Sequence, residues 1–138
     1  MTPPPVATAR ALARYQSAAV STASPPNLVL MLYDRLQRDL RMAGEALVAK
    51  DLAAANAQLQ HAQEIVLELR ASLDTTAWDG AQTLAGLYDF LHDELVAANV
   101  SKDPGRIAAC QALVEPLAEA WRSAAADAGL GDGSAAAG

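Results

Sequence analysis

Histidine, cysteine and carboxylate side chains are the groups in this sequence that could carry out acid–base, nucleophilic or metal chemistry. The chain has two histidines, His61 and His92, and one cysteine, Cys110. Asp89 precedes His92 by three positions, which is about one helical turn. A di-iron helical bundle needs two such carboxylate–histidine pairs together with further glutamates. We therefore expect no bound metal, and we interpret both histidines as ordinary surface residues.

Nucleophilic chemistry is no better supported. Cys110 occupies an apolar position of a helical pattern, where a small buried apolar residue is the simplest interpretation. No glycine-rich phosphate loop and no Ser/His/Asp set is evident in the sequence. The sequence therefore predicts a protein that is not an enzyme and needs no cofactor.

Composition and charge exclude further classes of partner. The 138-residue chain is 52% hydrophobic but only 4% aromatic, which favours closely packed helices. Its formal net charge of −6 argues against nucleic acid or an anionic membrane surface as partner. No apolar run approaches the roughly 20 residues of a membrane-spanning helix, and no charged-then-apolar leader opens the chain. We expect a cytoplasmic protein with no membrane insertion.

Apolar residues recur at spacings of three and four in four successive stretches, which is typical of helices packed in a bundle. Asp51 and Asp103 precede two of the stretches as expected N-caps. Connections this short make neighbouring helices antiparallel. The sequence thus predicts an all-α fold. The predicted parts are a flexible N-terminal arm or short helix over 1–23, an antiparallel four-helix bundle over 24–127 and a disordered tail over 128–138.

The spacing also predicts which side chains form the core. The second helix should bury Leu52, Ala55, Leu59, Ala62, Val66, Leu69 and Leu73. The third helix, over 81–98, should bury Leu84, Tyr88, Leu91, Leu95 and Ala98. The fourth should bury Ile107, Cys110, Val114, Leu117 and Trp121, and Pro116 should bend it. The charged residues of the first helix, Asp39 among them, should face water.

Several large apolar residues lie outside these core positions. Neighbouring helices can share and cover such residues, or the residues can leave a groove for the amphipathic segment of a partner. Our candidates for such a groove are Ile65, Leu67, Phe90 and Leu113.

Short motifs along the chain resemble those of one protein family. In order, they are Tyr15-Gln16, Ala23-Ser24-Pro25, Leu32-Tyr33-Asp34, Glu68-Leu69 with Ser72-Leu73-Asp74, Leu87-Tyr88-Asp89, Ala98-Asn99 and Trp121. This order resembles the flagellar secretion chaperone family, FliS, over about residues 15–123. The resemblance implies a cytosolic export chaperone. It would bind the C-terminal region of flagellin, prevent premature polymerisation and deliver flagellin to the gate of the flagellar type III secretion apparatus.

The resemblance also implies a role for the N-terminal arm. Similar arms are thought to cover the flagellin site and to move aside on binding, so Tyr15 is a further candidate binding residue. The arm here is longer and richer in proline than is usual in the family. Pro26-Asn27 replaces a common acidic–basic pair, and Pro116 interrupts the last helix.

Two other function classes stay open at this stage. A structural or adaptor bundle could bind another amphipathic helix through the same apolar residues. A histidine phosphotransfer domain is also a four-helix bundle, but the residues after His61 are Ala62-Gln63-Glu64, without a basic side chain to assist a phosphoryl group.

Overall fold

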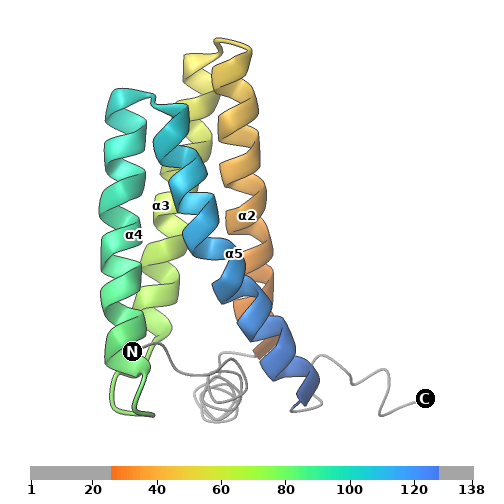
Figure 1. Cartoon of the computed structure of the whole chain (residues 1–138), viewed down its shortest axis with the longest axis vertical. Coiled ribbons are helices and arrows are strands. Elements are labelled where there is room, and N and C mark those ends of the chain that lie inside the picture. The colour runs from red at the N-terminus through yellow and green to blue at the C-terminus, as the bar shows by residue number, and fades with distance from the viewer. Residues whose placement is uncertain (1–25, 128–138) are drawn as a thin grey trace, which may run out of the picture.

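Four long helices make up the part of the chain that the computed structural model describes, residues 26–127 (Figure 1). They are α2 (Pro26–Val48), α3 (Leu52–Ser72), α4 (Ala81–Ser101) and α5 (Pro104–Asp127). The predicted all-α four-helix bundle is therefore confirmed. The predicted arm over 1–23 and the predicted tail over 128–138 lie outside the described residues.

Successive helices run in opposite directions and form a closed ring. Each helix packs on two neighbours, in the pairs α2–α3, α3–α4, α4–α5 and α2–α5. The α4–α5 pair has the least extensive packing of the four. In Figure 1, α5 begins beside the end of α4 and then crosses toward α2, so that α4 and α5 diverge along α5.

Two tight turns connect the helices at one end of the bundle. Lys50 and Lys102 adopt left-handed backbone conformations there, with φ of 59° and 54°. Asp51 caps α3 by accepting a hydrogen bond from the Ala54 amide (3.0 Å), and Asp103 accepts one from the Gly105 amide (2.8 Å). Both predicted caps are confirmed. Helix α4 ends three residues later than predicted, because the Lys102 amide still donates to the Ala98 carbonyl (2.8 Å).

The longer α3–α4 loop, residues 73–80, lies at the other end of the bundle. Asp74 accepts hydrogen bonds from the Thr76 hydroxyl and amide, which lower the pKa of the Asp74 carboxyl. The Trp78 ring covers Gly80 so closely that a Cβ there would lie 2.0 Å from a ring carbon. A side chain at this position would have to displace the indole. Gly80 thus allows α4 to begin directly beneath Trp78.

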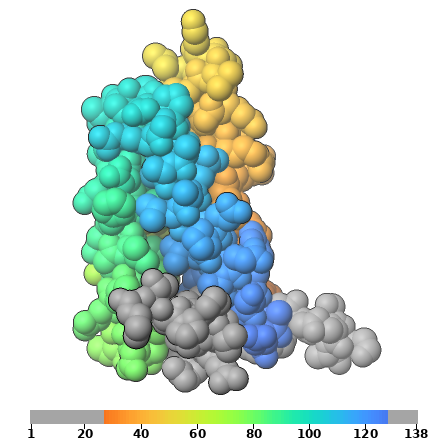
Figure 2. All heavy atoms as spheres, in the orientation of Figure 1, coloured from red at the N-terminus to blue at the C-terminus, as the bar shows by residue number. Residues whose placement is uncertain are grey.

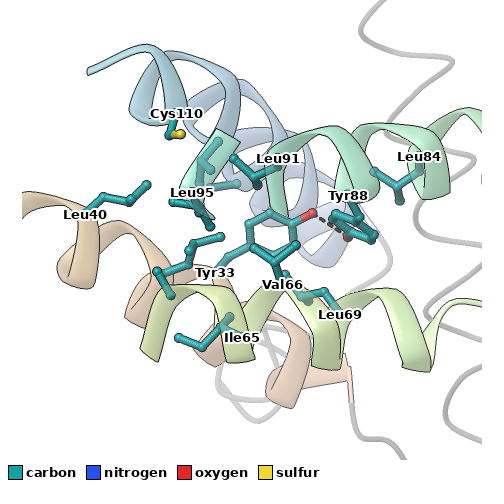
Figure 3. Packing of buried hydrophobic residues seen from close by; sticks show 14 of the residues in the cluster. Tyr33, Leu40, Ile65, Val66, Leu69, Leu84, Tyr88, Leu91, Leu95 and Cys110 are labelled. Atoms are coloured by element: carbon teal, nitrogen blue, oxygen red, sulfur yellow. Dashed lines mark hydrogen bonds between the residues drawn. The ribbon is translucent and has the colours of Figure 1, made fainter. Parts of the chain in front are cut away.

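The predicted core positions of α3, α4 and α5 are buried with two exceptions (Figure 3). All five predicted α4 residues are buried, and so are six of the seven predicted for α3. The exception is Leu52, which is 55% exposed because it is the first residue of α3. In α5, Ala118 is fully buried and Leu117 only partly, so the prediction of Leu117 as a full core residue is corrected.

Asp39 is the one charged residue buried in the described part of the chain, so its predicted position facing water is wrong. Its carboxylate accepts a hydrogen bond from Arg35 Nε (3.0 Å) and makes a short one with His61 Nδ1 of α3. The His61 side chain is 41% exposed. It is therefore a bridge between α2 and α3 rather than an unattached surface histidine.

Helices α5 and α2 are held together by both apolar and polar contacts. The rings of Tyr33 and Trp121 lie 6.2 Å apart between their centroids. Nearer the surface, Arg122 donates to Asp34 (3.0 Å) and to Gln37 (2.8 Å). The hydrogen bond to Asp34 is the main reason that the pKa of Arg122 is raised.

Candidate functional site

An apolar groove lies between α4 and α5, where the two helices diverge. Its volume is about 190 Å³, and its lining is Leu87, Leu91, Ala112, Leu113, Pro116 and Leu117. Leu91 is buried and forms part of the core, Leu113 and Leu117 are half-buried, and Leu87 is 37% exposed. Figure 2 shows α4 and α5 side by side on one face of the molecule. We call this feature the α4–α5 groove.

A second groove, the α3–α4 groove, lies on the other side of α4. It has a volume of about 210 Å³ and is lined by Val66, Leu67, Arg70, Tyr88, Asp89, His92 and Asp93. An ion pair between Arg70 and Asp89 (3.1 Å) bridges its two walls. Most of its lining residues are charged or polar, so it is less suited than the α4–α5 groove to bind an apolar side chain.

The structure separates the residues that the sequence predicted as one groove. Leu113 lines the α4–α5 groove, whereas Leu67, 51% exposed, lines the α3–α4 groove. Phe90 is 50% exposed and lies one helical turn after Leu87, so it extends the apolar surface beside the α4–α5 groove. Tyr15 lies outside the described residues.

Ile65 belongs to the core rather than to an exposed groove, and this part of the prediction is corrected. It is only 5% exposed. It follows His61 by four residues, which places it on the same face of α3. His61 binds Asp39 of α2, so this face of α3 is the one that α2 covers.

Sequence reasoning missed several groove residues. Leu87 was named only as part of a family motif, and Pro116 only as a source of bending. For Pro116 a signal is available in the sequence, because Leu113, Pro116 and Leu117 recur at three- and four-residue spacing along one side of α5. Met31 of α2, 64% exposed, lines neither groove.

Comparison with known proteins identifies the family. The family model described as "Flagellar protein FliS" matches residues 8–128 of this chain. The chain belongs to the FliS family. The chain is similar to the flagellar secretion chaperone FliS of Bacillus subtilis, 33% identical over 110 residues that cover 80% of this chain and 82% of the relative. The flagellar secretion chaperone FliS of Salmonella typhimurium is 34% identical over 106 residues, which cover 75% and 78%.

Membership of the FliS family places the chain among flagellar export chaperones and not among enzymes. Residues 26–127 contain no group of three histidine, cysteine or carboxylate residues that could hold a metal ion. In the same range, no helix is long and apolar enough to span a membrane.

Proposed function

We propose that this protein is a cytoplasmic chaperone that binds the C-terminal region of flagellin and presents it to the flagellar type III export gate. By covering that region, it would prevent premature polymerisation of flagellin. Family membership and the names of the relatives support the flagellar role. The α4–α5 groove supports the mode of binding, and it is the observation on which our proposal rests.

Large apolar side chains remain open to solvent along this groove. Leu87 and Phe90 contribute them from α4, and half-buried Leu113 of α5 lines the groove. Exposed apolar surface of this kind marks a site for another protein segment. An amphipathic helix suits it, because such a helix presents apolar residues at three- and four-residue spacing. The C-terminal region of an unassembled flagellin would supply apolar faces of this kind.

The free-energy cost of ordering the flagellin segment determines how much surface it must cover on this protein. A segment that becomes ordered on binding loses conformational entropy, which costs about 2–5 kcal/mol or more of the interaction free energy. One groove of about 190 Å³ holds only a small part of such a segment. The flagellin segment should therefore continue over the exposed surface of α4, with Phe90 as its next contact. Tyr15 and Leu67 remain candidates for further contacts.

Titration calorimetry with a peptide of the flagellin C-terminal region tests the proposed function. We expect a 1:1 complex and a clearly negative heat-capacity change, because apolar surface leaves water. A peptide of the same composition in scrambled order is the control. Absence of binding at about 50 μM peptide, a weak-affinity range, would contradict the proposal. Equal binding of both peptides would favour an unspecific adaptor bundle instead.

A further inference from the structure

The α4–α5 groove contains a backbone acceptor that an uninterrupted helix would not offer. Proline has no amide hydrogen, so Pro116 cannot donate to the carbonyl of Ala112, four residues earlier in α5. The side-chain hydrogen bonds to backbone carbonyls within residues 26–127 go to Leu69, Ala97 and Asn99. The Ala112 oxygen therefore lacks the donor four residues later that a regular helix provides, and no side chain of this part of the chain donates to it.

This oxygen lies on the groove side of α5. In a helix, the carbonyl of one residue points along the axis toward the residue four positions later. The Ala112 oxygen thus lies on the helix surface between Ala112 and Pro116, and both residues line the groove. Both residues are also exposed, so the helix surface around the oxygen is open to solvent.

The charges nearby favour a donor in the ligand. Glu115 is exposed and belongs to no ion pair within residues 26–127. Glu119, one turn later, is paired with Arg122. A ligand group placed over the Ala112 carbonyl therefore meets the partial negative charge of the carbonyl oxygen and the negative charge of Glu115. These charges attract an amide, hydroxyl or cationic donor and repel a carboxylate.

We propose that the Ala112 carbonyl, left without its helical donor by Pro116, accepts a hydrogen bond from a side chain of the bound flagellin segment. This rests on the proposed function. A helical ligand uses its own backbone amides internally, so the donor is a side chain: Asn, Gln, Ser, Thr, Lys or Arg. That residue stands beside the apolar residue that fills the groove. Binding would then require the flagellin segment to have a polar residue at one fixed position, in addition to apolar residues that fill the groove.

Pro116→Ala tests this inference, because it restores the amide that donates to the Ala112 carbonyl. It also removes two methylene groups of the proline ring from the groove lining, so a second measurement, given below, separates the two effects. We expect the Tm of the free protein to rise, since an interior helical hydrogen bond is gained. Affinity for the flagellin peptide should fall about 3–10-fold, the amount that one hydrogen bond supplies. Stability and affinity thus change in opposite directions. Unchanged affinity, or a loss of binding far beyond 10-fold, would overturn the inference.

An alanine scan of the polar residues of the peptide then separates the hydrogen bond from groove shape. One substitution should weaken binding to the wild-type protein about 3–10-fold and have little effect on binding to Pro116→Ala. If every substitution costs the same with both proteins, the inference is wrong. Leu113→Ala is the matched control. It should weaken binding by shrinking the apolar lining, and the sensitive peptide position should stay sensitive.

These experiments distinguish the two proposals. If the wild-type protein does not bind the flagellin peptide, the proposed function fails. If it binds the peptide and Pro116→Ala binds equally well, only the role of the Ala112 carbonyl fails.

Discussion

The phenol oxygens of Tyr33 and Tyr88 lie 2.6 Å apart in the core and form a hydrogen bond between α2 and α4 (Figure 3). These two helices are diagonal in the bundle, and neither packs directly on the other. Because both rings are almost fully buried, the bond joins opposite corners of the bundle through its interior. A buried hydrogen bond of this kind fixes how the diagonal helices are placed along the bundle axis.

Replacing either tyrosine by phenylalanine should reveal this diagonal bond. We expect Tyr33→Phe and Tyr88→Phe each to lower the free energy of unfolding by about 0.5–1.5 kcal/mol. The double variant should lose less than the sum of the two, because each single change already breaks the shared bond. Urea denaturation of all four proteins measures this coupling. Strict additivity would show that the two hydroxyls contribute independently.

The His61 bridge should contribute to stability, whereas His92 should not. His61→Ala leaves one oxygen of the fully buried Asp39 carboxylate without its partner, which should cost about 1–3 kcal/mol. His92→Ala is the matched control. His92 lines the α3–α4 groove without a hydrogen bond to another residue of 26–127, so its removal should change stability by less than about 0.5 kcal/mol. Equal effects in thermal unfolding would contradict a structural role for His61.

Substitutions test which groove binds the flagellin peptide under the proposed function. We expect Leu113→Ser and Phe90→Ser to weaken binding by about 1–3 kcal/mol, because both side chains lose water on binding. Leu67→Ser in the α3–α4 groove should have a smaller effect. Calorimetry with the flagellin peptide measures all three variants. The reverse ranking would assign flagellin to the α3–α4 groove.

Ile65→Ser provides the internal comparison for these variants. It introduces a hydroxyl and a cavity in the core, so it should reduce stability by about 2–5 kcal/mol. If Ile65→Ser leaves Tm unchanged but abolishes binding, Ile65 is a binding residue and our assignment of it to the core is wrong.

Replacing lysine by glycine should stabilise one of the two tight connections between helices more than the other. Lys50 and Lys102 both have positive φ, which glycine adopts without strain. Lys50→Gly should therefore stabilise the protein by about 0.5–1 kcal/mol. Lys102→Gly should gain less, because Lys102 Nζ also donates to the Asn99 carbonyl (2.6 Å) and side chain (2.7 Å). Chemical denaturation compares the two variants, and a larger gain from Lys102→Gly would refute this reasoning.

The thiol of Cys110 should react slowly in the folded protein. Burial, aided by Glu94, raises the pKa of Cys110 to about 11. At pH 8 the thiolate is therefore scarcer than in the unfolded chain, and the sulfur is also shielded from solvent. Because the unfolded thiol ionises first, stability should fall as pH rises from about 9 toward 11. A native-state labelling rate equal to that in urea would contradict this prediction.

Helical periodicity predicted the α4 core and both aspartate caps correctly, because these features depend on residues close together in the sequence. It did not predict Asp39 or Ile65, whose burial depends on α2 and α3 covering each other's flanks. Periodicity gives the direction of a side chain around one helix. It does not show how much of that helix's circumference the neighbouring helices cover. A pairing such as Asp39 with His61 depends on the register between two helices.

The candidate site was predictable only in part for the same reason. Leu67, Phe90 and Leu113 were all recognised as apolar residues outside the core positions. The structure places Leu113 in the α4–α5 groove and Leu67 in the α3–α4 groove, on the other side of α4. Which off-core residues gather in one groove depends on how far α5 diverges from α4. That divergence is a property of the assembled helices, and no stretch of the sequence carries it alone.

The ring of helices also has a consequence for how the protein folds. Three of its four interfaces join helices that are consecutive in the chain, and they can form as soon as each hairpin closes. Only the α2–α5 interface joins the first and last described helices. The largest loop-closure entropy is therefore lost in that single step. Tyr33 with Trp121 and Arg122 with Asp34 should form late, so mutations there should accelerate unfolding while leaving the folding rate almost unchanged.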